Sequence, residues 1–307
     1  MKKKSLKVRF LKSIPIYIMM LPGIIYLICN NYMPMFGMMI AFKKVNWQKG
    51  LWKSDWCGLD NFTYLFQSRD SYIMIRNTVL YNVLFIILGT ACAIAVAILL
   101  NEIVAKKTKS LYQSIILLPY LMSWVVVSYL VYAFLSNDTG FMNNTLLPTL
   151  GLETINWYQE SSYWPFILTF VNLWKSIGFS MVIYYASIVG ISGEYYEAAR
   201  LDGAGKWQQI TRITLPLLKP TIITLFIMNV GRIFASDFGL FYQVPRNQGA
   251  IYDTTQTIDT YVYNALMKLG NTSMSSAASV LQSIVGFVLV MTANKIVRKY
   301  ESESALF

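Results

Sequence analysis

The residues with the most chemical content form one short polar stretch at positions 197–216. Glu197, Arg200 and Asp202 precede a Gly-Ala-Gly turn at 203–205, and the stretch lies between two apolar segments that are each long enough to cross a bilayer. A charged helix and turn at a membrane face indicates contact with a soluble partner. An amphipathic connector that lies on lipid headgroups is the alternative, and these residues alone leave both interpretations open.

The side-chain inventory excludes most catalytic chemistry. The sequence has no His, which excludes His-ligated metal sites and Ser-His or Cys-His nucleophiles. Cys29, Cys57 and Cys92 are scattered and odd in number, so neither a disulfide framework nor a thiolate metal site is indicated. No G-x-x-x-x-G-K-[ST] phosphate-binding loop occurs. We therefore expect no metal, no cofactor and no enzymatic activity in this chain, and any energy source must come from a partner.

The polar stretch is expected to fold as two short helices joined by a glycine turn. Ser192 or Gly193 can begin the first helix, and Glu194 suits the positive end of its dipole. Good helix formers follow, and Gly203 then permits a left-handed turn. The second helix is expected over residues 206–215. One face of this helix is expected to carry Trp207, Ile210, Ile213 and Thr214, and Pro216 and Pro220 are expected to mark the start of the next apolar span.

The chain that positions this loop has the composition of an all-α membrane protein. Hydrophobic residues make up 55% of its 307 residues and charged residues only 13%, whereas soluble domains carry about a quarter charged residues. Helices of about 20 apolar residues can cross a bilayer because their backbone hydrogen bonds are satisfied internally. We expect six spans, at about residues 14–42, 79–101, 112–135, 164–190, 216–235 and 277–297. The first carries Pro22 and Pro34 and should therefore be kinked or partly irregular, and it is interpreted as an uncleaved signal anchor.

The distribution of Lys and Arg predicts the orientation of these spans, because cytoplasmic loops are enriched in basic residues. Basic residues concentrate in segments 1–13, 102–111, 191–215 and 298–307. We therefore expect a basic cytoplasmic N-terminus at 1–13, a transmembrane domain at 14–297 with its cytoplasmic loop at 191–215, and a cytoplasmic tail at 298–307. The net charge of +11 then indicates contact with anionic lipid, and a nucleic-acid partner is not expected.

The loop resembles the signature of the permease subunits of bacterial binding-protein-dependent ABC importers. In that signature Glu-Ala-Ala is followed by Gly four residues after the second Ala and then by Ile-x-Leu-Pro. Every position is filled here, by Glu197, Ala198, Ala199, Gly203, Ile213, Leu215 and Pro216. Asp202 and Ala204 match the wider form, Glu-Ala-Ala-x-x-Asp-Gly-Ala. Segments 32–37, 41–43, 58–62, 77–78 and 259–263 resemble the carbohydrate branch, in particular its polysaccharide-type permeases.

This resemblance implies the fold, the partners and the location of the protein. The fold would be the six-helix transmembrane domain of a type I ABC importer, as in maltose permease, in the bacterial cell membrane. A second permease would complete the translocation path, two ATPase subunits would bind ATP and Mg²⁺, and an extracytoplasmic solute-binding protein would deliver a sugar, expected to be an oligosaccharide. Import of another small solute, or a membrane scaffold whose loop docks an unrelated partner, are the alternatives.

The resemblance also gives the loop a role in energy coupling. Its first helix, at about 194–201, would sit in a cleft of the ATPase and transmit closure of the ATPase pair to the membrane helices. The coupling residues would be Glu194, Glu197, Ala198, Ala199, Arg200, Leu201, Asp202, Gly203, Ala204, Ile213, Leu215 and Pro216. In this interpretation Glu197→Ala and Gly203→Asp abolish transport and weaken ATPase binding without preventing membrane insertion.

Candidates for the substrate path are polar side chains within the expected spans, since polar groups in a membrane are functional candidates by default. They are Asn172, Lys175, Tyr184, Tyr185, Asn229, Arg232 and Gln282. Each has a structural alternative, such as helix pairing for Lys175 or snorkelling for Arg232. Aromatic belts at the membrane interfaces are expected to contain Trp124, Trp157 and Trp164. The outer loop at 236–276 is expected either to contact the binding protein or to be a simple solvated loop.

Overall fold

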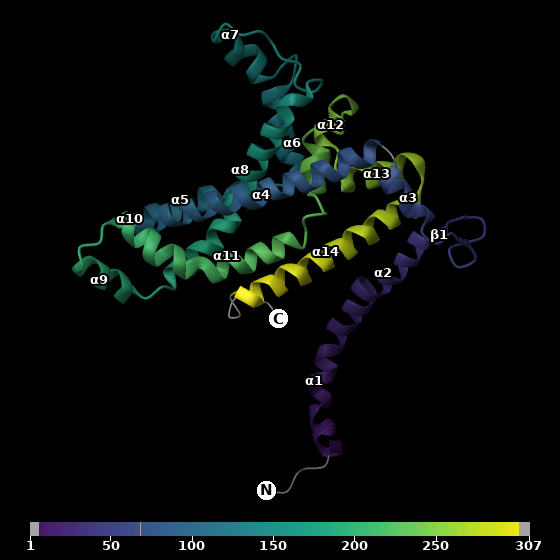
Figure 1. Cartoon of the computed structure of the whole chain (residues 1–307), viewed down its shortest axis with the longest axis horizontal. Coiled ribbons are helices and arrows are strands. Elements are labelled where there is room, and N and C mark those ends of the chain that lie inside the picture. Colours follow the sequence, from purple (N-terminus) through teal and green to yellow (C-terminus); the bar gives the residue numbers. More distant parts are fainter. Residues whose placement is uncertain (1–5, 68, 301–307) are drawn as a thin grey trace. The chain divides into compact units, whose positions relative to one another are not determined.

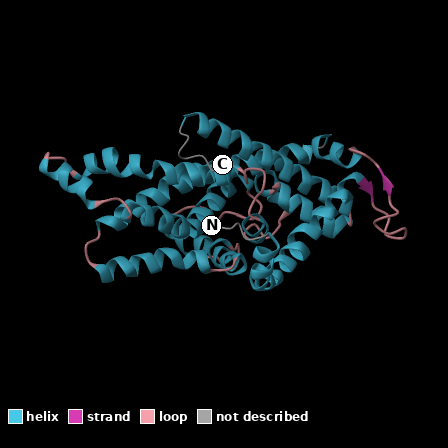
Figure 2. Cartoon of the chain, turned by 90° about the horizontal axis from the view of Figure 1, so that it is seen from below, coloured by secondary structure: helices cyan, strands magenta, loops and turns pink. Residues whose placement is uncertain are grey.

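Helices form almost all of the regular structure in the computed structural model, which describes residues 6–67 and 69–300 (Figure 1, Figure 2). The only strands in these ranges are β1 (Lys43–Lys44) and β2 (Asp55–Trp56). The chain divides into two compact units. The first comprises Met1–Phe66 and Ala265–Val280, and the second Gln67–Asn264 and Leu281–Phe307. The signature loop therefore lies entirely within the second unit.

The first unit begins with a long apolar helix that changes its pitch near Pro34. Helix α1 (Leu6–Leu27) continues into the π-helical turn η1 (Ile28–Tyr32), α2 (Met33–Met35) and the 3-10 helix η2 (Phe36–Phe42). Proline lacks an amide hydrogen, and in a regular α-helix its ring clashes with the carbonyl four residues earlier. The wider π-helical turn just before Pro34 relieves this conflict. The irregularity expected in the first span is therefore a change of helix type.

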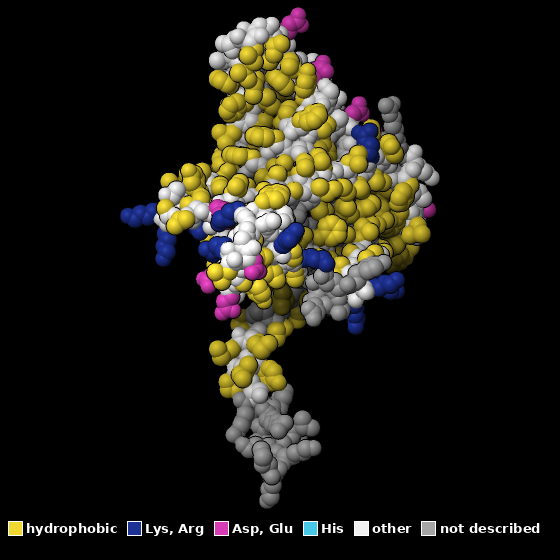
Figure 3. Space-filling view, turned by 60° about the vertical axis from the view of Figure 1, so that its left-hand side comes forward, with side chains coloured by type: hydrophobic (Ala, Val, Ile, Leu, Met, Phe, Trp, Pro, Cys, Tyr) yellow, Lys and Arg dark blue, Asp and Glu magenta, His cyan; other side chains and the backbone are white. Residues whose placement is uncertain are grey.

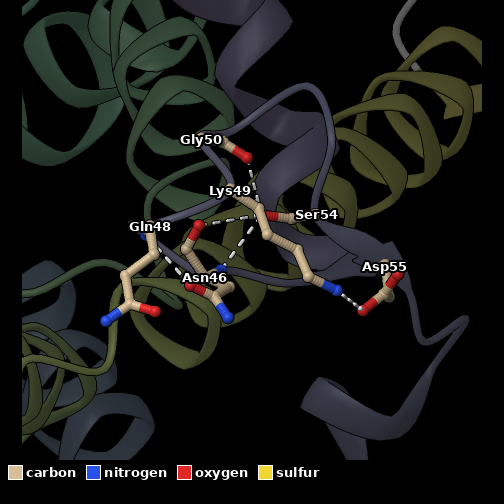
Figure 4. A network of polar contacts seen from close by, with 6 residues as sticks. All are labelled: Asn46, Gln48, Lys49, Gly50, Ser54 and Asp55. Carbon is tan, nitrogen blue, oxygen red and sulfur yellow. Dashed lines mark hydrogen bonds and ion pairs between the residues drawn. The ribbon is translucent and has the colours of Figure 1, made fainter.

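A short hairpin follows, and a polar network holds its loop (Figure 4). The Ser54 hydroxyl accepts a hydrogen bond from the backbone amide of Asn46 at 3.0 Å and donates one to the Gly50 carbonyl at 2.9 Å. Lys49 and Asp55 form an ion pair at 3.2 Å. These contacts stabilise a hairpin whose strands have only two residues each. Helix α3 (Asp60–Gln67) comes next along the chain.

The second unit is a bundle of long helices with the signature loop at one end (Figure 1). Helices α4 (Arg69–Glu102) and α5 (Lys106–Leu121) both pack against α8 (Trp164–Val189). Helix α11 (Leu215–Val230) and the second half of α14 (Thr272–Tyr300) belong to the same unit. Small and large side chains interlock in the apolar core nearest the loop, which contains Ala93, Ala97, Leu100, Met181, Tyr184, Ile188 and Leu218.

The third expected span is sharply bent. Helix α5 ends at Leu121, and α6 (Trp124–Leu135) starts after two residues at an angle of 95°. Pro119 lies in the last turn of α5, and the Ser123 hydroxyl caps α6 by accepting the amide of Val126 at 3.3 Å. The segment at 112–135 is therefore two helices, because a helix-breaking proline is followed by a good N-cap.

Five helical stretches of the described residues are long and apolar enough to cross a membrane, and six if α5 and α6 form one broken span. They are Ser13–Phe42, Asp70–Glu102, Ser161–Val189, Lys206–Val230 and Thr272–Lys299. Each overlaps an expected span. Because the fourth stretch ends at Val230, Arg232 lies in the turn after it and not inside a span as expected. Hydrophobic side chains cover much of the face seen in Figure 3, as bilayer contact requires.

The segments at the end of the second unit away from the signature loop are folded. Those between α6 and α8 are η3 (Met142–Leu146), α7 (Leu147–Thr149) and η4 (Ser161–Tyr163). Those after α11 are η6 (Gly239–Gln243), η7 (Gly249–Ile251), α12 (Tyr252–Thr255) and the start of α13 (Ile258–Leu269), whose residues from Ala265 onwards belong to the first unit. Trp164 is 0% exposed in a core with side chains from η6 and η7, and its indole donates to the Trp157 carbonyl at 2.7 Å. Trp164 is therefore a core residue and not part of an aromatic belt, and 236–276 is not a simple solvated loop.

Candidate functional site

The signature loop begins with helix α9 (Gly193–Leu201), which matches the first helix expected from the sequence. The Ser192 hydroxyl accepts the amide of Glu194 at 3.4 Å, and the Glu194 carboxylate lies in the first turn, where the helix dipole is positive. Arg200 occupies the last turn, where the dipole is negative. A helix of nine residues is marginal in water without such terminal contacts. None of its residues is fully buried, and all but the half-buried Tyr196 and Ala199 are exposed, so most of the surface of α9 is open to other molecules.

A tight turn at Gly203 reverses the chain after α9. Gly203 has a φ of +78°, a conformation that costs glycine little and other residues more. The amide of Ala204 donates to the Ala199 carbonyl at 2.8 Å, and that of Asp202 donates to the Ala198 carbonyl at 3.0 Å. The last carbonyls of α9 are therefore satisfied within the turn itself.

The second helix of the loop continues directly into a membrane helix. Pro216 lies at the start of α11 as expected, but no break precedes it, because helix α10 (Lys206–Gln209), the π-helical turn η5 (Ile210–Thr214) and α11 form one continuous stretch. The wide π turn just before Pro216 accommodates its missing amide. Trp207 is 75% exposed whereas Thr214 is buried. The expected common face of these residues is therefore wrong, because the π turn changes the register of the side chains.

Side-chain hydrogen bonds tie α9 to this continuous helix. The hydroxyls of Tyr196 and Thr214 lie 3.0 Å apart. The buried amide of Gln209 donates to the Ala204 carbonyl at 2.9 Å, which joins the turn to the second helix. The position of α9 is thus linked to the helix that enters the membrane.

The expected coupling residues divide into an exposed group and an inner group. The exposed group on α9 and the turn contains Glu194, Glu197, Ala198, Arg200, Leu201, Asp202 and Gly203. Ala199, Ala204, Ile213 and Leu215 are half-buried, while Pro216 is exposed on the continuous helix. Leu201 and Trp207 are 89% and 75% exposed, so this charged loop also presents two large apolar side chains. Exposed large apolar side chains with a polar rim are typical of a protein-docking surface.

A cavity of about 270 Å³ separates α9 and α10 from the end of α4. Its lining includes Glu197 and Arg200 of α9 and Gln209 of α10. At its edge the Lys206 ammonium contacts the Glu102 carboxylate at 2.6 Å, although both side chains are largely exposed and the pair contributes little to stability. The pair does connect the signature loop to the last residue of α4.

Lys175 lies at the break between α5 and α6. Its side chain is buried, and its ammonium donates to the carbonyl of Tyr120 at 2.8 Å and to that of Pro119 at 3.4 Å. The same ammonium lies 5.1 Å from the centre of the Trp124 ring and 5.5 Å from that of Tyr120. A cation at the carboxyl end of a helix complements its dipole and the unpaired carbonyls there. Lys175 therefore stabilises the break.

Trp124 extends this cluster to the segment after α11. Its indole donates to the Asp237 carboxylate at 2.9 Å, and the other carboxylate oxygen accepts the amides of Gly239 at 2.9 Å and Leu240 at 3.3 Å. A Cβ at Gly239 would overlap the Trp124 ring, so only glycine fits there. The broken helix is thus joined to the turn that begins η6.

The other candidate path residues do not gather at one site. Tyr184 is buried in the core nearest the signature loop, and Tyr185 packs beside it under the Lys109 ammonium at 5.6 Å. Asn172 is half-buried on α8, one turn before Lys175, whereas Asn229 and Arg232 are exposed around the end of α11. The Gln282 amide donates to the Phe234 carbonyl at 2.7 Å and to the Asp259 carboxylate at 3.2 Å. Gln282 therefore holds the turn after α11.

Several contacts at these sites could not be derived from the sequence. Tyr196 and Thr214 are 18 residues apart along the chain, and Trp124 and Asp237 are 113 residues apart. The signal for the broken helix was present, because Pro119 and Ser123 are a helix breaker followed by a capping residue.

Comparison with known proteins agrees with this architecture. Residues 86–300 match the family described as the binding-protein-dependent transport system inner membrane component. The chain is 33% identical to the polygalacturonan/rhamnogalacturonan transport system permease protein YteP of Bacillus subtilis (strain 168), over 98% of this chain and 93% of that protein. It is 31% identical to Protein LplB of the same organism, over 94% of this chain and 90% of that protein.

Solved structures agree as well. A bacterial ABC transporter involved in the import of the acidic polysaccharide alginate has a chain that matches with a TM-score of 0.88 and 33% identity, over 97% of this chain and all of that one. A second structure of a bacterial alginate ABC transporter, in complex with an alginate pentasaccharide-bound periplasmic protein, matches with a TM-score of 0.86 and 33% identity over 97% of this chain and 98% of that one. The chain therefore belongs to the family of inner membrane components of binding-protein-dependent transport systems and is a multi-pass permease subunit of an ABC importer.

Proposed function

We propose that this permease carries an oligosaccharide across the cell membrane in complex with a second, homologous permease subunit. Its relatives YteP and the alginate transporter are named for the transport of polysaccharides. In a complex with these subunits, a solute-binding protein would deliver the sugar from outside the membrane. Two separate ATPase subunits would bind ATP and Mg²⁺ on the inside, since this sequence has no phosphate-binding loop.

Helix α9 is the element proposed to dock on the ATPase, and the exposure of seven of its nine residues is the observation that supports this role. Leu201 and Trp207 would enter an apolar cleft, while Glu197 and Arg200 would form charge-assisted contacts at the rim. Closure of the ATPase pair would then move α9 together with the continuous helix to which Tyr196 and Thr214 tie it.

The proposed orientation has both termini in the cytoplasm, on the same side as the signature loop. It is supported by the basic residues at 1–13, 102–111 and 191–215 and by the tail at 298–307, although 1–5 and 301–307 lie outside the described residues. The opposite end of the second unit, with η6, α12 and the start of α13, would then face the binding protein.

The proposal is tested with the purified complex of this chain, its partner permease and its ATPase in proteoliposomes. ATP hydrolysis should be stimulated by the sugar-loaded binding protein, and labelled oligosaccharide should accumulate only when ATP is on the ATPase side. Leu201→Ser should release the ATPase during purification, whereas Leu152→Ser, an exposed leucine between α7 and η4, should not. Retention of the ATPase by Leu201→Ser, or accumulation that does not need ATP, would refute the proposal.

A further inference from the structure

A small polar cavity lies at the end of the second unit opposite the signature loop. Helices α8 and α11 both connect to that loop at one end, and the segment that follows α11 forms part of the cavity at the other. The cavity has a volume of about 230 Å³. It is lined by Val125, Ser128 and Tyr129 of α6 and by Tyr242, Gln243, Arg246 and Asn247 of η6 and the following turn.

The turn that carries Arg246 has an unusual backbone. Arg246 has a φ of +55° and Asn247 a φ of +49°, a left-handed conformation that is common for asparagine but unfavourable for arginine. Asn247 and Asn264 exchange two side-chain hydrogen bonds of 3.0 Å, and the Tyr252 hydroxyl donates to the Asn247 side chain at 2.8 Å. These contacts hold a strained arginine in one position, and strain that persists in this way is concentrated at functional sites.

The Arg246 guanidinium is oriented but has no acidic partner among the described residues. Its central carbon lies 4.1 Å from the centre of the Tyr132 ring, so one face is stacked on an aromatic ring. The ion pairs of the described residues join Lys49 to Asp55 and Lys206 to Glu102 and do not include Arg246. Stacking uses the face of a guanidinium and leaves its edge, which binds carboxylates through two parallel hydrogen bonds.

The remaining lining groups suit a sugar ring. Tyr129 is 65% exposed and offers an aromatic face for the C–H groups of a pyranose. The Gln243 amide can both donate to and accept from ring hydroxyls, and Ser128 retains acceptor capacity because its hydroxyl hydrogen is donated to the Val125 carbonyl at 2.7 Å. Burial and the neighbouring Tyr263 raise the pKa of Tyr242, whose hydroxyl therefore stays protonated at neutral pH.

From this arrangement we infer that the cavity is a subsite for a hexuronate residue, in which Arg246 binds the sugar carboxylate and Tyr129 and Gln243 contact the ring. This inference rests on the proposed transport of an oligosaccharide and narrows its class to acidic oligosaccharides. An arginine fork on a rigid turn would distinguish a uronate from the neutral hexose of the same shape.

The test measures direct sugar binding to the whole transporter complex in nanodiscs without the binding protein, by saturation-transfer difference NMR. The probes are trigalacturonate and the neutral galactotriose. Arg246→Asn removes the guanidinium while keeping a residue that tolerates the left-handed turn, and Arg246→Lys keeps the charge but not the fork. Trigalacturonate should bind the Asn variant about tenfold or more weakly than the wild type, with the Lys variant between them, because hydrogen bonds to charged groups are lost. Galactotriose binding should be the same for all three proteins.

A matched control is Lys53→Gln, an exposed basic residue of the first unit, which should bind trigalacturonate like the wild type. Equal binding of trigalacturonate by wild type and Arg246→Asn would overturn the subsite. Unchanged sugar binding with weaker docking of the binding protein would also overturn it and assign Arg246 to a protein contact. In either case ATP-driven oligosaccharide import by the wild type would leave the proposed function standing, whereas its absence would refute that function separately.

Discussion

The hydroxyl of Tyr196 on α9 lies 3.0 Å from the hydroxyl of the buried Thr214, in the π-helical turn that leads into α11. It is a direct side-chain link between α9 and the helix that continues into α11. A link of this kind lets a displacement of α9 reach the membrane helix without passing through the turn at Gly203.

Tyr196→Phe and Thr214→Val are therefore expected to reduce the sugar transported per ATP hydrolysed. Each removes one hydrogen bond of about 1 kcal/mol, so the ATPase should still bind while transport per ATP falls several-fold. Uptake and hydrolysis measured together in proteoliposomes check this. Tyr112→Phe, an exposed tyrosine of α5, is the matched control. If Tyr196→Phe and Thr214→Val both transport as much sugar per ATP as the wild type, the link does not transmit motion.

Lys175→Met is expected to destabilise the protein. It leaves the carbonyls of Pro119 and Tyr120 without the ammonium at the break, at a cost of about 1–3 kcal/mol. The melting temperature of the purified permease complex should fall, and Lys175→Arg should restore most of it. A higher KM for the sugar at an unchanged melting temperature would instead identify Lys175 as a substrate contact.

Gly178→Ala is expected to force α8 away from α5. A Cβ at this position would overlap the backbone carbonyl of Ile116, which cannot move like a flexible side chain. Overpacking of this kind costs about 1–3 kcal/mol, so the yield of folded protein and its melting temperature should both fall. Gly23→Ala in α1 meets no atom within 4 Å and should behave as the wild type. Equal stability of the two variants would contradict the close approach of α5 and α8.

Tyr158→Phe is expected to stabilise the protein, most clearly at high pH. The Tyr158 hydroxyl is buried without a hydrogen-bond partner among the described residues, so its removal should raise the free energy of unfolding by about 1 kcal/mol. Burial raises the pKa of Tyr158 from 10.0 to about 12, although the Arg246 charge lowers it in part. The folded state therefore disfavours ionisation, and stability that is fully present below pH 10 is lost as the pH rises towards 12.

Melting curves of wild type and Tyr158→Phe, recorded between pH 8 and pH 12, measure how the stability of each protein depends on pH. The phenylalanine variant should lose less stability over the alkaline part of the range. A parallel loss in both proteins would show that Tyr158 is solvated in the folded state.

The sequence predicted the membrane helices and α9 because both depend on local properties. Long apolar runs define the spans, and Ser192, Glu194 and Gly203 define the ends of α9 through their own capping and turn chemistry. The bend after Pro119 and the continuous helix through Pro216 were not predicted, because a proline can end a helix or be absorbed by a π turn. Which occurs depends on packing.

The polar clusters were harder to predict, because they join residues that are distant in the sequence. Lys175 could be recognised as unusual because it lies in an apolar span. Its contacts with Pro119, Tyr120 and Trp124 could not be predicted. Arg246 had no sequence signal at all, since its left-handed backbone and its stacking on Tyr132 appear only in three dimensions.

The central claim is that α9 docks on the ATPase, and site-directed cross-linking tests it most directly. Cys29, Cys57 and Cys92 are replaced by serine, and one cysteine is introduced at Ala198 or, as a control, at Leu152. A cysteine-to-amine cross-linker is then applied to the whole transporter complex with and without ATP. The account predicts that Ala198→Cys is cross-linked to the ATPase with an ATP-dependent yield and that Leu152→Cys is not. Cross-linking of the ATPase through position 152, or none through position 198, would contradict it.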